Sequence, residues 1–179
     1  MVRRISPFFA KNVSKTALEE RFHRLFSANG PALVRLATSY TNSASDRDDL
    51  FQDIALGIWK ALPGFRAESS ERTFIFRIAH NRAISHISQL RPPTRSDEEL
   101  EMPDPRPNPE KGFSQEQQEA RLFEAIHQLP IDYRQVITLT LEGMSYAEVA
   151  EILGIGESNV GVRLTRARQM LRESLEVQK

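Results

Sequence analysis

Polar side chains near the carboxyl end of the sequence have the spacing of a nucleic-acid-binding motif. Residues 145–148 read Ser-Tyr-Ala-Glu, the pattern of a capping box in which serine and glutamate satisfy each other's backbone amides at a helix start. Gly154-Ile155-Gly156 then predicts a tight turn with a buried apolar centre, and a longer basic helix is expected over 157–175. A short helix, a glycine turn and a longer basic helix are typical of a helix-turn-helix, which places its second helix in the major groove of DNA.

The second helix of this motif separates into an apolar and a polar face. The inward face is expected to consist of Val160, Leu164, Ala167 and Leu171. The outward positions, which would reach base edges and phosphates, are Ser158, Asn159, Val162, Arg163 and Arg166. The alternative is a structural helical hairpin whose arginines are only solvated. Gly161 either marks a close backbone approach or is a tolerated defect.

A second polar surface is expected in the first half of the chain. A long helix over 73–89 carries the polar residues Arg77, His80, Asn81 and Arg82 at helical spacing. The loop before it contributes Phe65, Arg66, Ser69 and Ser70. Such groups are suited to hold an unpaired base and its phosphates. The alternative is ordinary surface polarity beside a core, in which Phe74 packs.

An acidic face is expected on the preceding helix, 46–62, opposite its apolar stripe. Its members are Asp49, Gln52 and Asp53. The face is either simply solvated or docks a basic or amphipathic partner helix. Trp59 on the same helix is expected to serve packing.

Catalytic, metal and cofactor chemistry has little support in the sequence. The chain has no cysteine, and its four histidines are scattered, so thiolate and clustered-histidine metal sites are excluded. Phosphate-cradling loops and nucleophile-elbow glycines are missing. We therefore expect a protein with no catalytic residues, no metal and no cofactor, rather than an enzyme.

The charge is balanced overall but unevenly distributed. Residues 1–95 carry 15 basic and 8 acidic side chains, whereas 96–130 carry 3 and 9, and 131–179 carry 6 and 7. The first half is therefore basic enough to contact nucleic acid. No run of the sequence is apolar enough to span a membrane, so we expect a cytoplasmic chain without stable membrane insertion.

Helical apolar spacing on both sides of a proline-rich segment predicts an all-α protein with two small domains. The interval 92–115 holds most of the prolines and an acidic run, and is expected to be an extended linker. The expected division is a tail (1–14), a first domain (15–91), the linker and a second domain with the helix-turn-helix (116–179). The expected helices cover 18–27, 31–40, 46–62, 73–89, 121–128, 133–141, 145–153 and 157–175.

Taken together, these segments resemble the extracytoplasmic-function (ECF) sigma factors of bacterial RNA polymerase. The likeness is carried by Asp49-Leu50-Phe51-Gln52-Asp53, by 72–81 with Phe74 and Phe76 where Trp and Tyr are usual, and by 144–154 with 163–168. Gly156, Gly161 and Val162 depart from the family pattern, so the promoter sequence does not follow from it.

The resemblance implies a division of labour between the two domains. The first, sigma region 2, would bind core RNA polymerase through Asp49, Gln52 and Asp53. It would also recognise the promoter's minus-ten element through Phe65, Arg66, Ser69, Ser70, Arg77, His80, Asn81 and Arg82. The second, sigma region 4, would read the minus-thirty-five element through Ser158, Asn159, Val162, Arg163 and Arg166. The implied partners are core RNA polymerase, promoter DNA and a separate anti-sigma factor.

Two other functions are compatible with parts of the pattern. A stand-alone helix-turn-helix regulator would bind a palindromic operator as a dimer, without polymerase. A sigma-like scaffold would hold partners without binding DNA. The first half of the chain disfavours the stand-alone regulator, because such a regulator needs no polymerase-binding helix.

Overall fold

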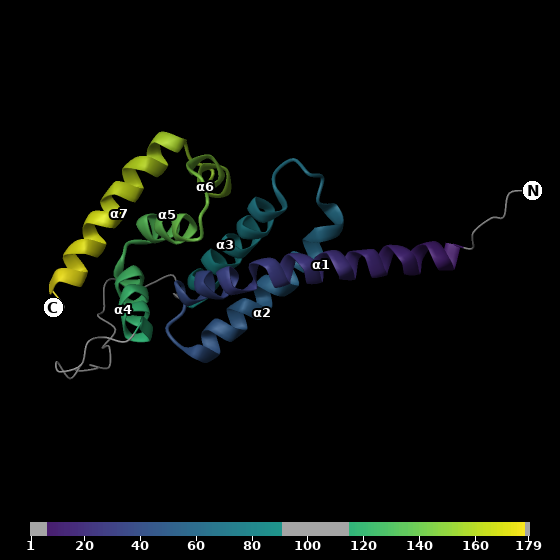
Figure 1. The fold of residues 1–179 in the computed structure, drawn as a ribbon, viewed down its shortest axis with the longest axis horizontal. Helices are drawn as coiled ribbons and strands as arrows, with labels where there is room; N and C mark the ends of the chain where they lie inside the picture. The colour runs from purple at the N-terminus through teal and green to yellow at the C-terminus, as the bar shows by residue number, and fades with distance from the viewer. Residues whose placement is uncertain (1–6, 91–114, 178–179) are drawn as a thin grey trace, which may run out of the picture.

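The computed structural model describes residues 7–90 and 115–177, and every regular element in these ranges is helical (Figure 1). The first half contains α1 (Pro7–Thr38), α2 (Ala44–Ala61), the short 3-10 helix η1 (Leu62–Gly64) and α3 (Glu71–Leu90). The second half contains α4 (Gln115–Gln128), α5 (Ile131–Leu141), α6 (Tyr146–Leu153) and α7 (Glu157–Val177). The all-α prediction is confirmed, whereas the expected linker lies almost wholly outside the described residues.

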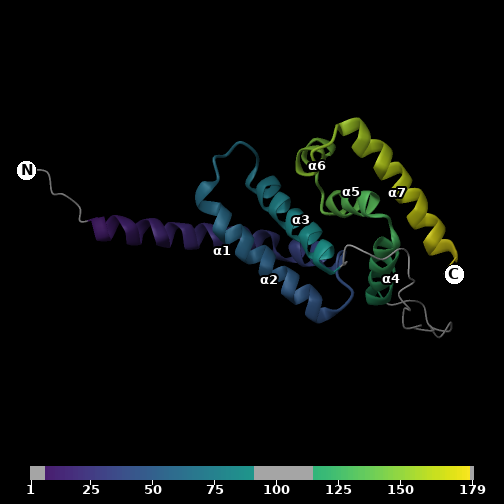
Figure 2. The ribbon, with the colours of Figure 1, turned by 180° about the vertical axis from the view of Figure 1, so that it is seen from behind.

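The first element is one long helix rather than the two expected over 18–27 and 31–40. It begins at Pro7, inside the segment expected as a tail, and continues through Pro31. Proline costs a helix one backbone hydrogen bond. Leu25, Leu33 and Leu36 are nevertheless buried on both sides of it, so packing of the continuous helix outweighs that cost. Figures 1 and 2 show its amino-terminal part projecting beyond the other helices.

Helices α2 and α3 form a closely packed pair. Helix α2 is capped by Ser43, whose hydroxyl accepts the amide of Asp46 at 3.1 Å, and it buries the expected Leu50, Ile54 and Ile58. Gly57 faces α3, where an added Cβ would lie 2.9 Å from Arg82 Nε and 3.1 Å from Ile78 Cγ2. The glycine therefore sets how closely the two helices approach.

The inward face of α3 is formed mainly by the neighbours of Phe74 and Ile78. The fully buried apolar residues are Ile75, Phe76, Ala79 and Ala83, whereas Phe74 and Ile78 are half-buried against the core. Phe74 instead packs on Phe65, with ring centroids 4.7 Å apart. Trp59 serves packing as expected, and its ring meets Phe22 edge-on at 5.3 Å.

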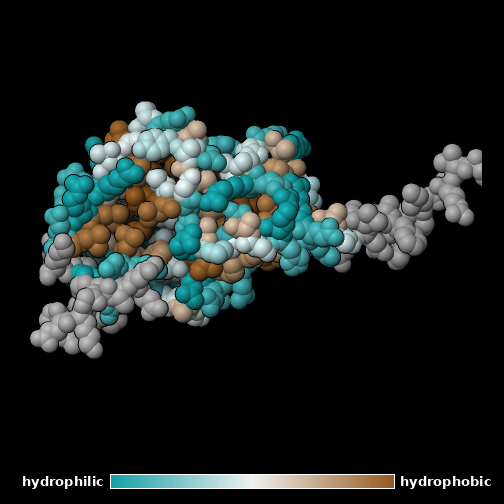
Figure 3. Space-filling view, viewed as in Figure 1, coloured by the Kyte–Doolittle hydropathy of each residue, from teal (hydrophilic) through white to brown (hydrophobic). Residues whose placement is uncertain are grey.

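The second half is a helical unit with α7 on its outer side (Figures 1 and 2). Ser145 and Glu148 form the expected capping box at the start of α6, and Gly154 ends α6 in the left-handed conformation with φ 67°. The four expected inward residues of α7 are all buried: Val160, Leu164, Ala167 and Leu171. Figure 3 shows apolar residues gathered between α7 and α5 on one face.

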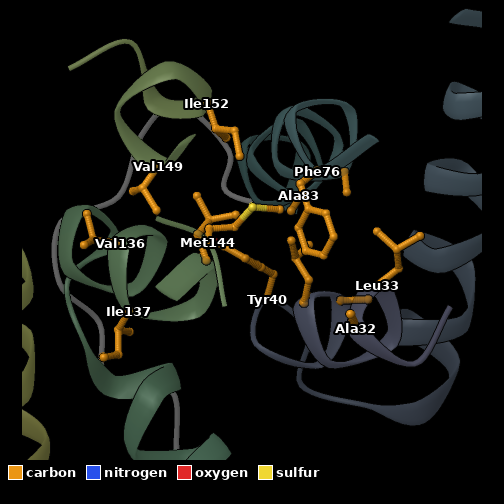
Figure 4. Close-up of a cluster of buried hydrophobic side chains, with 14 of the residues drawn as sticks. Ala32, Leu33, Tyr40, Phe76, Ala83, Val136, Ile137, Met144, Val149 and Ile152 are labelled. Carbon is orange, nitrogen blue, oxygen red and sulfur yellow. The ribbon is translucent and has the colours of Figure 1, made fainter. Parts of the chain in front are cut away.

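The two halves also pack against each other through α3 and α6 (Figure 4). Met144 and Ile152 of the second half lie with Tyr40 and Phe76 of the first, and all four are buried. Within residues 7–90 and 115–177 no helix has both the length and the apolar character needed to cross a bilayer. The same residues contain no group of three or more histidine or acidic side chains placed to hold a metal ion.

Candidate functional site

The helix-turn-helix presents its predicted reading face to solvent. Ser158, Asn159 and Val162 are exposed in the first two turns of α7, and the Val162 side chain is 53% accessible. The neighbouring Val160 and Leu164 are fully buried. Burial of one face fixes the rotation of α7 and leaves the opposite face, with these residues, accessible to a partner.

The two arginines of this face are held at its border with α5. Arg163 is half-buried; its Nε donates to Asn159 Oδ1 at 3.1 Å, and its Nη1 lies 3.5 Å from Asp132 Oδ1. Arg166 is exposed and its Nη1 lies 3.4 Å from the Tyr133 hydroxyl. Both guanidinium groups have weak, partly exposed partners that a phosphate or base could replace.

Gly161 is not a point of steric necessity. A Cβ at this position would meet Tyr146 Cε2 at 3.6 Å, which is an ordinary van der Waals distance. Of the two interpretations of this glycine, the tolerated defect fits the structure better.

The loop between η1 and α3 is tied to α1. The Phe65 ring lies beneath the Arg21 guanidinium, 4.9 Å from its carbon, and Glu71 at the start of α3 bonds Arg21 Nε at 2.8 Å. The Ser70 hydroxyl accepts the Thr73 amide at 2.9 Å and caps α3. Arg21 and Glu71 were not predicted as site residues, because no local pattern in the sequence pairs two residues 50 positions apart.

The loop also has a polar, accessible surface. Arg66 and Ser70 are exposed and Ser69 is half-buried. Ala67 has φ 57°, a left-handed conformation that is uncommon for a residue with a Cβ. Phe65 therefore holds the loop against α1, while the polar side chains of the loop remain accessible to solvent.

The polar residues of α3 are divided between three environments. Asn81 is exposed, whereas Arg82 lies over α2, with Nη1 3.4 Å from Asp53 Oδ1. Arg77 forms an ion pair with Glu151 of α6. His80, expected on the polar face, is instead buried; neither ring nitrogen has a protein hydrogen-bond partner, and burial lowers the pKa of the imidazole. Arg77 is therefore paired, and His80 buried, in this arrangement.

The predicted acidic face of α2 lies where it was expected. Asp49 and Gln52 are exposed, and Asp53 is half-buried beside Arg82. The Asp53–Arg82 pair joins the acidic face of α2 to the polar surface of α3. The two surfaces consequently have a fixed relative position.

Comparisons with known proteins agree with this fold. Residues 25–92 match the family model "Sigma-70 region 2", and residues 119–171 match "Sigma-70, region 4". The chain is 32% identical to the RNA polymerase sigma factor NccH of Alcaligenes xylosoxydans xylosoxydans, over 87% of each chain. It is 31% identical to the ECF RNA polymerase sigma-E factor of Haemophilus influenzae, over 93% of this chain and 98% of that one.

Solved structures give the same result for the fold. The structure of CnrH in complex with the cytosolic domain of CnrY superposes with a TM-score of 0.67, at 26% identity, over 90% of this chain and 91% of that one. The sigma factor RpoE from Bartonella quintana, in complex with the anti-sigma factor NepR, also superposes with a TM-score of 0.67, at 24% identity, over 89% of this chain and 99% of that one.

Two helical units, one with a helix-turn-helix and both matching sigma-70 regions, define a DNA-binding transcription protein of the sigma-70 class. Within that class the chain belongs to the ECF sigma factors, as its similarity to NccH and to the H. influenzae protein shows. It acts in transcription initiation, directing core RNA polymerase to promoters. The stand-alone regulator gains no support from these relatives.

Proposed function

We propose that the two halves divide promoter recognition between them, with region 2 over 15–91 and region 4 over 116–179. The observation that carries this assignment is the reading face of α7. Ser158, Asn159 and Val162 are exposed there, directly beside buried Val160 and Leu164. Region 4 thus reads the minus-thirty-five element in the major groove, with Arg163 and Arg166 on the flanking phosphates.

Region 2 binds polymerase and opens DNA in this proposal. Asp49, Gln52 and Asp53 dock core RNA polymerase, because they form the accessible acidic face of α2. The loop 65–70, with Phe65, Arg66, Ser69 and Ser70, captures an unpaired base of the minus-ten element. Arg77, His80, Asn81 and Arg82 support the opened strand once the surface is uncovered. The segment 92–115 joins the two regions.

The protein works without catalysis of its own, in the cytoplasm, and under control of an anti-sigma factor. The relatives CnrH and RpoE were each solved in complex with a second protein, the cytosolic domain of CnrY and the anti-sigma factor NepR. A chain with the same fold offers the same kind of surface to such a partner.

The assignment of α7 is tested by promoter-specific transcription with purified core polymerase. Asn159→Ala removes one base contact, so initiation falls about 5- to 150-fold, the equivalent of about 1–3 kcal/mol. Arg166→Ala removes one phosphate contact and lowers initiation about equally at every promoter. Gln169→Ala, an exposed position further along α7, is the matched control and leaves initiation unchanged. A palindromic footprint produced without polymerase would instead support a stand-alone regulator.

A further inference from the structure

The turn between α5 and α6 is held by two arginines of the first half. Glu142 is buried, with a side chain only 5% exposed, and it accepts two hydrogen bonds from Arg35 at 2.8 and 2.6 Å. Its backbone carbonyl accepts a hydrogen bond from Arg72. Burying a carboxylate costs free energy unless it is paired in this way, so the surroundings of Glu142 favour an acidic side chain.

Helix α6 continues the same pattern along α3. The Thr73 hydroxyl donates to Glu148 Oε1 at 3.1 Å, and Arg77 forms its ion pair with Glu151. Thr73 and Arg77 are one turn apart on α3, and their two partners are one turn apart on α6, so the two helices match in register. We call Arg35, Arg72 and Arg77 the arginine face, and Glu142, Glu148 and Glu151 the acidic edge.

Apolar burial reinforces the polar contacts. Met144 and Ile152 come from the acidic side of this interface and lie with Tyr40 and Phe76 of the first half (Figure 4). At the far end, His127 Nε2 of α4 donates to the Thr38 carbonyl at 3.2 Å. The contacts between the two halves therefore extend from α4 to α6, with apolar side chains at the centre and charged side chains at the border.

The docked arrangement covers part of the surface assigned to the promoter. Arg77 is paired with Glu151, and His80, one turn further along α3, is 7% exposed. The reading face of α7 remains accessible, with Ser158, Asn159 and Val162 exposed. Docking thus occupies Arg77 of region 2, whereas Asn81 of the same face and the groove-reading face of region 4 remain exposed.

We infer that the arginine face is a binding site for acidic helical surfaces, that its ligand in the free chain is the chain's own acidic edge, and that opened promoter DNA competes with this edge at Arg77. The competition rests on the proposed function of α3, whereas the docking does not. Carboxylates and phosphates bind arginine through the same planar donor fork, so the acidic edge occupies the place of a nucleic-acid backbone.

The docking is tested by distance measurement in the free full-length chain. The chain has no cysteine, so dyes can be attached solely at Asn42→Cys in the loop after α1 and at Gln128→Cys on α4, two exposed positions close to the His127–Thr38 contact between the halves. Energy transfer between the dyes is expected to be high in this background. The Glu142→Gln/Glu151→Gln variant is expected to lower it, because the arginine face loses two of its carboxylates.

Two controls separate docking from net charge and from folding. Glu173→Gln/Glu176→Gln removes the same charge at exposed positions near the end of α7 and is expected to leave energy transfer high. Arg35→Gln removes the partner of Glu142 in the first half and is expected to lower energy transfer as well. Arg47→Gln on the surface of α2 is expected to leave it high. Circular dichroism of each variant establishes that its helices are intact. Two results would overturn the docking: low energy transfer in the dye-labelled parent, or unchanged energy transfer in the Glu142→Gln/Glu151→Gln variant.

The competition is tested by binding of a single-stranded promoter oligonucleotide to the same variants without polymerase. If about nine in ten free chains are docked, Glu142→Gln/Glu151→Gln binds roughly tenfold more tightly than the parent. The Glu173→Gln/Glu176→Gln control shows how much of any gain comes from charge alone. Opening without a gain beyond that control overturns the competition, whereas promoter-specific transcription with core polymerase separately tests the proposed function.

Discussion

At the scale of single residues, the helix-turn-helix depends on one carboxylate. Hydrogen bonds from the Ser145 amide and hydroxyl hold the pKa of Glu148 below its ordinary value of 4.5. A lowered folded-state pKa means that the stabilisation is complete above the unfolded pKa and is lost as the pH falls through the folded one. The capping box thus links the stability of α6 to acidity.

We predict that Glu148→Gln lowers the free energy of unfolding by about 0.3–1 kcal/mol at neutral pH, because glutamine can keep the capping hydrogen bond but loses the negative charge in the first turn of α6. The difference between the variant and the parent should shrink as the pH falls below about 4.5, because the parent then loses its carboxylate. Urea unfolding at a series of pH values measures both effects. Glu173→Gln, an exposed glutamate on α7, is the control, and a pH-independent difference for Glu148→Gln would contradict the account.

Arg21 is a second residue with a defined role, because it positions the loop 65–70. Its guanidinium covers Phe65 and bonds Glu71, so it positions the loop 65–70 without facing the site itself. We predict that Arg21→Ala slows open-complex formation by roughly fivefold, which corresponds to the about 1 kcal/mol of an exposed cation–π contact. Affinity for core polymerase should not change, because α2 is untouched. Permanganate footprinting and a core-binding assay give the two readouts, and an equal loss in both would indicate a purely structural role.

At the scale of the elements, the α2–α3 pair is set by the space at Gly57. We predict that Gly57→Leu destabilises the first half by about 1–3 kcal/mol, because its side chain must displace Ile78 and Arg82. Gly64→Leu is the matched control, since an added Cβ there meets nothing within 4 Å. Thermal unfolding of the two variants compares them directly, and equal melting temperatures would contradict the close packing.

Elements with strong local signals were predictable from the sequence. The capping box at Ser145, the glycine turn at Gly154 and the buried stripe of α7 are each set by residues within a few positions of one another. By contrast, two helices were predicted over 18–27 and 31–40, where α1 in fact continues through Pro31. The cost of a proline inside a helix is visible in the sequence, whereas the packing that offsets this cost comes from other helices.

At the scale of the whole molecule, long-range pairings decide what is accessible. His80 was expected on a polar surface because its neighbours in α3 are polar, yet it is buried. Arg35 and Glu142 are 107 positions apart, so no spacing rule connects them. The candidate DNA-reading positions on α7 could be placed from periodicity, whereas the covering of α3 could not.

The central claim is that this chain directs core RNA polymerase to promoters. The most direct test is transcription in vitro from fragmented genomic DNA of the source organism, with mapping of RNA starts for core polymerase alone and for core with the protein. The account predicts new, discrete starts that share two spaced upstream elements and are weakened by Asn159→Ala. Failure of the protein to bind core polymerase, or binding without any new start, would contradict it.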